Sequence, residues 1–80
     1  MPTALGSDKL RFMKLLIELE REDDGRWIAD IPDLPGVSAY GTSREEAMVR
    51  AEALALRVLA DRIEHGETGP ALFDVSFKAA

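Results

Sequence analysis

The segment Pro32-Asp33-Leu34-Pro35-Gly36 constrains the fold of this 80-residue chain more than any other part of its sequence. Its two prolines have no backbone N–H to donate, and they disfavour helix at the residues that precede them. Gly36 supplies a position at which the backbone can turn freely. The segment therefore predicts that one strand ends before it and that another begins after it.

The residues before this segment have the alternation of a β-hairpin. Apolar side chains occupy every second position from Met13 to Leu19 and again from Trp27 to Ile31. This period is typical of strands with one buried face. Asp24-Gly25, between the two runs, is a common hairpin-turn sequence. We expect a five-residue loop with Glu20 opposite Arg26, which gives three apolar pairs: Leu19 with Trp27, Ile17 with Ala29, and Leu15 with Ile31.

A helix is predicted from Arg44 to about His65. Thr42 and Ser43 can each cap its start, and a glutamate three residues later, Glu45 or Glu46, completes a capping box. Apolar side chains then recur at helical spacing, at Ala47, Met48, Ala51, Leu54, Ala55, Val58, Leu59 and Ile63. Gly66 suits the position after the last helical turn, and Pro70 prevents continuation of the helix.

The short runs 37–41 and 72–77 predict a third and a fourth strand, so the element order is β-β-β-α-β. A crossover through a helix joins parallel strands, and the open edge beside the first strand is the natural place for the last one. We therefore expect an α+β fold with a mixed four-stranded sheet and one helix on one face. Residues 11–80 form this single domain, and residues 1–10 form a flexible tail. The face expected under the helix carries Met13, Leu15, Ile17, Leu19, Trp27, Ile31, Phe73, Val75 and Phe77.

The opposite face of the predicted sheet is too apolar to be left wholly in water. Its apolar residues are Phe12, Leu16, Ile28, Tyr40 and Leu72. A chain of this length has a marginal core, and the absence of cysteine excludes disulfides as a supplement. We therefore expect a homodimer or higher oligomer in which a second copy covers this face.

The formal net charge of −5 is concentrated in one hairpin. Residues 18–33 contain seven acids and two arginines, whereas the rest of the chain has eight acids and eight bases. An acidic chain is unsuited to direct binding of nucleic acid phosphates. The hairpin is either a solvated tip or a surface that attracts a basic partner.

Catalysis, metals and cofactors are not expected. Glu18, Asp30 and Asp74 share the predicted open face, but Leu16 and Ile28 lie between them, which argues against a two-metal site. The single histidine, His65, falls in the last helical turn, where its imidazolium suits the helix dipole, and no serine or cysteine nucleophile is paired with it. No apolar run has the length of a signal peptide or a membrane span, so we expect a soluble cytoplasmic protein.

The stretch DGRWIADIPDLPGVSAYGTSREEAMVRAEAL resembles the HicB-like antitoxin family. The residues that carry the resemblance, over roughly positions 12–78, are Gly25, Trp27, Pro32, Asp33, Leu34, Pro35, Gly36, Gly41, Thr42, Glu45, Glu46 and Ala47. The resemblance implies a truncated ribonuclease-H-like fold. It also implies that the chain binds and neutralises a small basic mRNA-cleaving toxin of the HicA type, which has a double-stranded-RNA-binding fold.

Many members of this family carry a further DNA-binding domain, whereas this chain stops after the fourth predicted strand, so we expect no direct DNA binding by it. Leu34, held between two prolines, is the expected apolar anchor for the partner. The expected partner site comprises Glu22, Asp23, Asp24, Asp33, Leu34 and Pro35. The alternative is a homo-oligomeric structural or regulatory binding module with no toxin partner.

Overall fold

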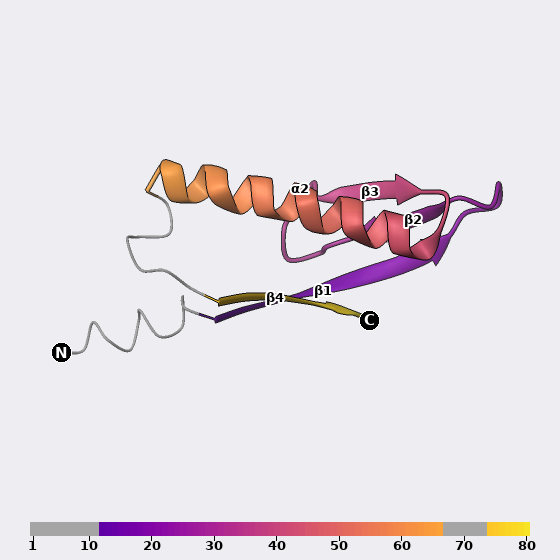
Figure 1. The fold of residues 1–80 in the computed structure, drawn as a ribbon, viewed down its shortest axis with the longest axis horizontal. Coiled ribbons are helices and arrows are strands. Elements are labelled where there is room, and N and C mark those ends of the chain that lie inside the picture. Colours follow the sequence, from indigo (N-terminus) through magenta and orange to yellow (C-terminus); the bar gives the residue numbers. More distant parts are fainter. Residues whose placement is uncertain (1–11, 67–73) are drawn as a thin grey trace.

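A computed structural model describes residues 12–66 and 74–80, and within them it contains a four-stranded sheet with one helix on one face (Figure 1). The elements are β1 (Phe12–Arg21), β2 (Trp27–Asp30), β3 (Ser38–Gly41), α2 (Arg44–Glu64) and β4 (Asp74–Ala79). The strand order is β3-β2-β1-β4, with β1, β2 and β3 antiparallel and β4 parallel to β1. The predicted α+β class and the predicted mixed sheet are therefore confirmed, whereas the ribonuclease-H likeness stays a prediction.

The hairpin between β1 and β2 differs from the expected register by two residues. Leu19 lies opposite Ala29, Glu20 opposite Ile28 and Arg21 opposite Trp27. The predicted pairings of Leu19 with Trp27, of Ile17 with Ala29 and of Glu20 with Arg26 are therefore wrong. The Glu22 N–H donates to the Arg26 carbonyl oxygen (2.7 Å) and the Gly25 N–H donates to the Glu22 carbonyl oxygen (2.9 Å). Five residues, Glu22 to Arg26, separate the two strands, so the loop has the predicted length but lies one residue later in the chain, with Gly25 at a φ of 91°. Since the shift is an even number of residues, every side chain keeps its predicted face.

The Pro32–Gly36 segment is a compact loop closed by backbone hydrogen bonds. The Ile31 N–H donates to the Val37 carbonyl oxygen (3.0 Å), the Leu34 N–H to that of Ile31 (2.9 Å), and the Val37 N–H to that of Leu34 (3.0 Å). Ile31, Leu34 and Val37 are all buried. The loop therefore separates β2 from β3, as predicted, and also adds the Leu34 side chain to the core.

The start of α2 decides between the two predicted caps. Ser43 is the N-cap, and its hydroxyl accepts the Glu46 N–H (3.0 Å). A carboxylate oxygen of Glu46 accepts both the N–H (2.6 Å) and the hydroxyl (2.9 Å) of Thr42. At the other end, Gly66 has a φ of 73° and its N–H donates to the Ile63 carbonyl oxygen (3.0 Å). Both predicted ends of the helix are confirmed.

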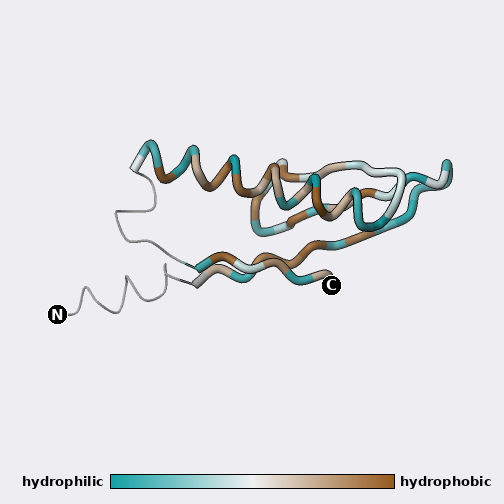
Figure 2. Tube along the Cα trace, in the orientation of Figure 1, coloured by the Kyte–Doolittle hydropathy of each residue, from teal (hydrophilic) through white to brown (hydrophobic). Residues whose placement is uncertain are grey.

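The core lies between α2 and the sheet, where apolar segments of the two layers face one another (Figure 2). Its buried side chains are Leu15, Ile17, Ala29, Ile31, Leu34, Val37, Ala47, Ala51, Ala55 and Leu59. Met13, Leu19, Trp27, Met48, Leu54, Val58, Val75 and Phe77 pack around them, as predicted. Ile63 was expected in this stripe, but its side chain is 45% exposed, so that assignment is wrong. Phe73 lies outside the described residues.

Candidate protein-interaction surface

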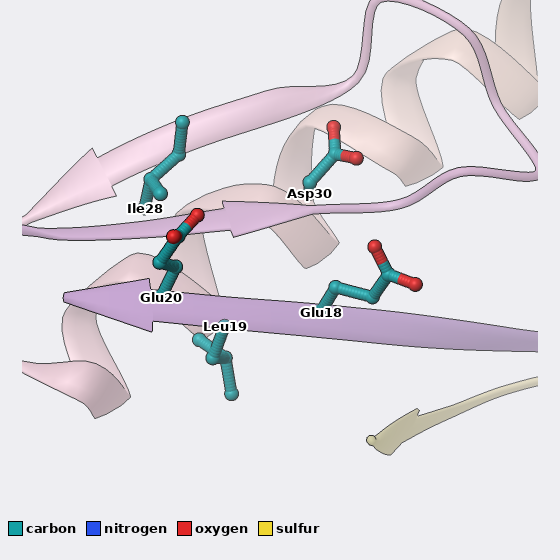
Figure 3. A pocket seen from close by; sticks show the side chains of 5 residues that line it. All are labelled: Glu18, Leu19, Glu20, Ile28 and Asp30. Carbon is teal, nitrogen blue, oxygen red and sulfur yellow. The ribbon is translucent and has the colours of Figure 1, made fainter. Parts of the chain in front are cut away.

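The sheet face away from α2, called here the open face, gathers carboxylates from β1 and β2. Cross-strand pairing places Glu18 beside Asp30 and Glu20 beside Ile28. These four residues and Leu19 line a shallow hollow of about 500 Å³. Figure 3 shows the side chains of Glu18, Glu20, Ile28 and Asp30 on one side of the two strands, while Leu19 points the other way. The alternation of β1 and β2 thus builds an acidic half of the open face.

The other half of the open face carries lysines. Lys14 lies beside Ser76, and Leu16 lies beside Lys78, across the parallel β1–β4 pair. Together with Asp33 from the loop after β2, they line a second hollow of about 470 Å³. The open face therefore has an acidic half along the end of β1 and a half of mixed charge beside β4, which also contains Leu16. The position of Asp33 next to these lysines depends on the loop conformation.

The predicted apolar patch of the open face is present in part. Leu16 and Tyr40 are exposed, and Ile28 is half-buried. The Arg26 guanidinium lies over the Tyr40 ring, 4.5 Å from its centroid, in cation–π geometry. The side chain of Phe12 and the whole of Leu72 lie outside the described part of the chain. The three described residues share one face, as the alternation predicts.

The acidic turn of the hairpin is partly neutralised by its own chain. Asp24 forms an ion pair with Arg26 (2.8 Å between Oδ2 and Nε), and its other carboxylate oxygen accepts the Arg26 N–H (3.0 Å). These bonds lower the pKa of Asp24 below its usual value, and the bond from the Arg26 backbone N–H has the largest effect. Asp23 is exposed and Glu22 is half-buried. Asp24 thus holds the turn together, whereas the carboxylates of Glu22 and Asp23 form no ion pair within the described residues.

The Leu34 side chain is not presented to a partner. It is 1% exposed and belongs to the core cluster. The prediction that the flanking prolines display it at the surface is therefore wrong, because the turn that they favour directs the side chain inward. Asp33 and Pro35, on either side of it, are exposed.

The residues considered for catalysis do not form a cluster. Asp74 lies opposite Phe12, at the start of β1, so it is about 20 Å along the strand from Glu18. Within the described residues, no group of three or more His, Cys, Asp or Glu side chains is placed to hold a metal ion. His65 Nδ1 lies 2.7 Å from the Asp61 carbonyl oxygen and 3.4 Å from its carboxylate, within the end of the helix. The expected lack of catalysis stays a prediction.

Comparisons with protein-family models, with curated proteins and with solved structures find no significant match to this chain. The described part contains no helix that is long and apolar enough to cross a membrane. A cytoplasmic location and the HicB-like resemblance therefore both stay predictions.

Proposed function

We propose that this chain binds and neutralises a small basic mRNA-cleaving toxin of the HicA type through the acidic half of its open face. The observation that carries the proposal is the convergence of Glu18, Glu20 and Asp30 around one hollow with Ile28 at its side. A ribonuclease must present positive charge to RNA phosphates. An acidic surface of this kind both attracts such a protein and competes with its substrate.

The charge of this surface is available to a partner. Within residues 12–66 and 74–80, Glu18, Glu20 and Asp30 form no ion pair. Three carboxylates in one place repel one another, and a cationic partner that binds there relieves this repulsion. Ile28 and Tyr40 lie side by side across β2 and β3, and they supply apolar area next to the charges. Charge thus accelerates encounter, while the apolar pair slows dissociation.

The hairpin turn extends this surface, although its three acids contribute unequally. Asp24 is already paired with Arg26, so its replacement is expected to disturb the turn more than the contact. Asp33 and Pro35 are exposed, but Asp33 lines the other hollow, beside Lys14 and Lys78. The proposed contact therefore does not depend on this loop, and Leu34 stabilises the loop from within the core.

The HicB-like resemblance supports a protein partner over a nucleic acid. Of the residues that carry it, Gly36 and Gly41 serve the loop after β2 and the packing of α2. The Thr42, Glu45 and Glu46 positions serve the start of α2. The motif thus mainly stabilises the fold, and the proposed contact rests on the charges of the open face.

The proposal is tested with a purified small basic toxin of the HicA type, by following cleavage of a labelled RNA. The chain should inhibit cleavage at equimolar amounts. At low ionic strength, the double variant Glu18→Gln/Asp30→Asn should associate with the toxin at least roughly tenfold more slowly than the parent chain does. In high salt the difference between the two association rates should be smaller. The control Asp61→Asn/Glu64→Gln removes the same charge from α2 and should bind as the parent does. Unimpaired cleavage in excess chain, or equal losses in the two variants, would refute the proposal.

A homo-oligomeric module without a toxin is the second candidate. It is favoured by the exposure of Leu16 and Tyr40 on the open face, where a second copy was predicted to bind. In that case the chain should self-associate through the open face, and Leu16→Glu should abolish the association. Inhibition of the toxin by a chain whose open face is not covered by a second copy would exclude this second candidate.

A further inference from the structure

The outer side of α2 carries a second apolar stripe, which the core does not use. It consists of Val49, Ala53, Leu56, Ala60 and Ile63. All five are exposed, with Val49 at 63%, Leu56 at 50% and Ile63 at 45%. These three are among the most exposed large apolar side chains of the described residues.

This stripe lies on the side of the helix opposite the sheet. Val49 is two positions after the buried Ala47, and Leu56 is two positions after Leu54, which packs against the core. Two residues correspond to about 200° of rotation around a helix. The stripe therefore faces away from the sheet, and no described part of the chain covers it.

The spacing of the stripe is that of a coiled-coil seam. Its members are separated alternately by four and three residues, which places Val49, Leu56 and Ile63 at d positions and the two alanines at a positions of a heptad. Alanine at the a positions permits two helices to approach closely. A surface helix that only has to cover a sheet needs no second apolar stripe of this period.

The charges beside the seam indicate which partner fits it. In a parallel pair of helices, a g residue lies next to the e residue five positions later in the other chain. Here the g positions are Glu45, Glu52 and the buried Leu59, and the e positions five residues later are Arg50, Arg57 and Glu64. Two of the three g–e pairs are therefore Glu–Arg pairs. A two-fold pair thus forms each Glu–Arg contact twice. An antiparallel pair centred on Leu56 would instead bring Arg57 against its own copy.

The side chains are placed for these contacts. The Arg50 guanidinium donates to the Glu46 carboxylate and to the Tyr40 carbonyl oxygen, both at 3.2 Å, and its side chain is still 60% exposed. Within the described residues, Arg57 takes part in no ion pair. Each arginine therefore has donors left for a glutamate of another chain.

We propose that α2 is a homodimerisation element, in which a second copy of this chain packs in parallel along Val49, Ala53, Leu56, Ala60 and Ile63. The seam spans only two heptads, so the dimer is expected to be weak, with a dissociation constant on the order of micromolar or above. The helix is already formed on the sheet, so no folding has to accompany association. Such a dimer leaves both open faces free, and it does not depend on the proposed toxin partner.

The first test compares two glutamate substitutions by sedimentation equilibrium. The parent chain should dimerise at about 100 μM, as expected for a weak two-heptad seam. Leu56→Glu should raise the dissociation constant at least tenfold, because it buries charge in the seam. Leu16→Glu, at an equally exposed position on the open face, should leave it unchanged, and circular dichroism should show both variants folded. A monomeric parent, or a dimer sensitive to Leu16→Glu alone, would overturn the proposal.

The second test establishes the orientation. Glu52→Arg and Arg57→Glu should each weaken the dimer, since each places like charges across the seam in a parallel pair. The double variant exchanges the two signs and should restore the parent dissociation constant. A double variant that stays as weak as the single ones would exclude the parallel arrangement.

Discussion

The layer between α2 and the sheet is packed differently at its two ends. Near β2 and β3 the helix presents alanines, Ala47, Ala51 and Ala55, and all three are fully buried. Near β4 the side chains are large, yet Val58, Val75 and Phe77 are only half-buried. Larger apolar residues thus exclude water less completely at the β4 end than small ones do at the β3 end.

The distance between the layers explains this difference. A Cβ on Gly41 would lie 2.5 Å from the backbone nitrogen of Ala47, so β3 and the start of α2 are in near-backbone contact. The helix packs mainly against β3 and β2, less against β1, and it separates from the β1–β4 edge along its length (Figure 1). Small residues let the helix and the sheet pack closely at the β3 end of the layer, whereas at the β4 end the side chains remain partly exposed to water.

The largest expected effect comes from truncating one core residue at each end. Leu34→Ala should lower the free energy of unfolding by about 2–5 kcal/mol, the usual range for a fully buried leucine. Phe77→Ala removes more atoms, but from a half-exposed site, and should cost roughly 1–2 kcal/mol. Urea unfolding followed by circular dichroism measures both. An equal or greater loss for Phe77→Ala would show that the β4 end contributes as much as the β3 end.

The elements of this fold could be predicted because their signals are local. The alternation of apolar and polar residues predicted the two faces of β1 and β2, and the pair Ser43 and Glu46 predicted the start of α2. The register of the hairpin could not be predicted, because it depends on which residue takes the left-handed position. With Gly25 in that position, the Glu22 N–H donates to the Arg26 carbonyl oxygen and the pairing shifts by two residues.

The candidate sites were harder to predict because they depend on the direction in which each side chain points. The open face followed from alternation, but the inward direction of Leu34 follows from the hydrogen bonds of its loop. The outer stripe of α2 is present in the sequence as a four-and-three spacing. Ile63, however, fits the spacing of both stripes, and only its exposure assigns it to the outer one.

A methyl group added at the closely packed end sharpens the comparison. Gly41→Ala places a Cβ against the backbone of Glu46 and Ala47, where no flexible side chain can move aside. The helix start must shift, and the cost should be about 1–3 kcal/mol. Ala79→Gly on β4 is a control for a small change at the other end. A Gly41→Ala protein as stable as the parent in urea unfolding would show that the two layers adjust freely there.

The smallest expected effect concerns the charge that fixes the start of α2 at the closely packed end. Hydrogen bonds from the Thr42 N–H and hydroxyl, more than the nearby Arg50, lower the pKa of Glu46 below its usual value of 4.5. The folded state therefore binds this proton less readily than the unfolded state does. The resulting stabilisation is fully present above pH 4.5 and is lost as the pH falls through the lowered pKa.

Glu46→Gln should accordingly lower the Tm at pH 7, and the difference from the parent should shrink steadily below pH 4.5. Ser43→Ala removes the neutral half of the same cap, at a cost of about 1 kcal/mol that should persist at acid pH. Thermal unfolding of the three proteins between pH 7 and pH 2 measures both differences. If the Glu46→Gln deficit is the same at both ends of this range, the side chain acts by packing and neutral hydrogen bonding. In that case the carboxylate charge makes no contribution to the stability of the closely packed end.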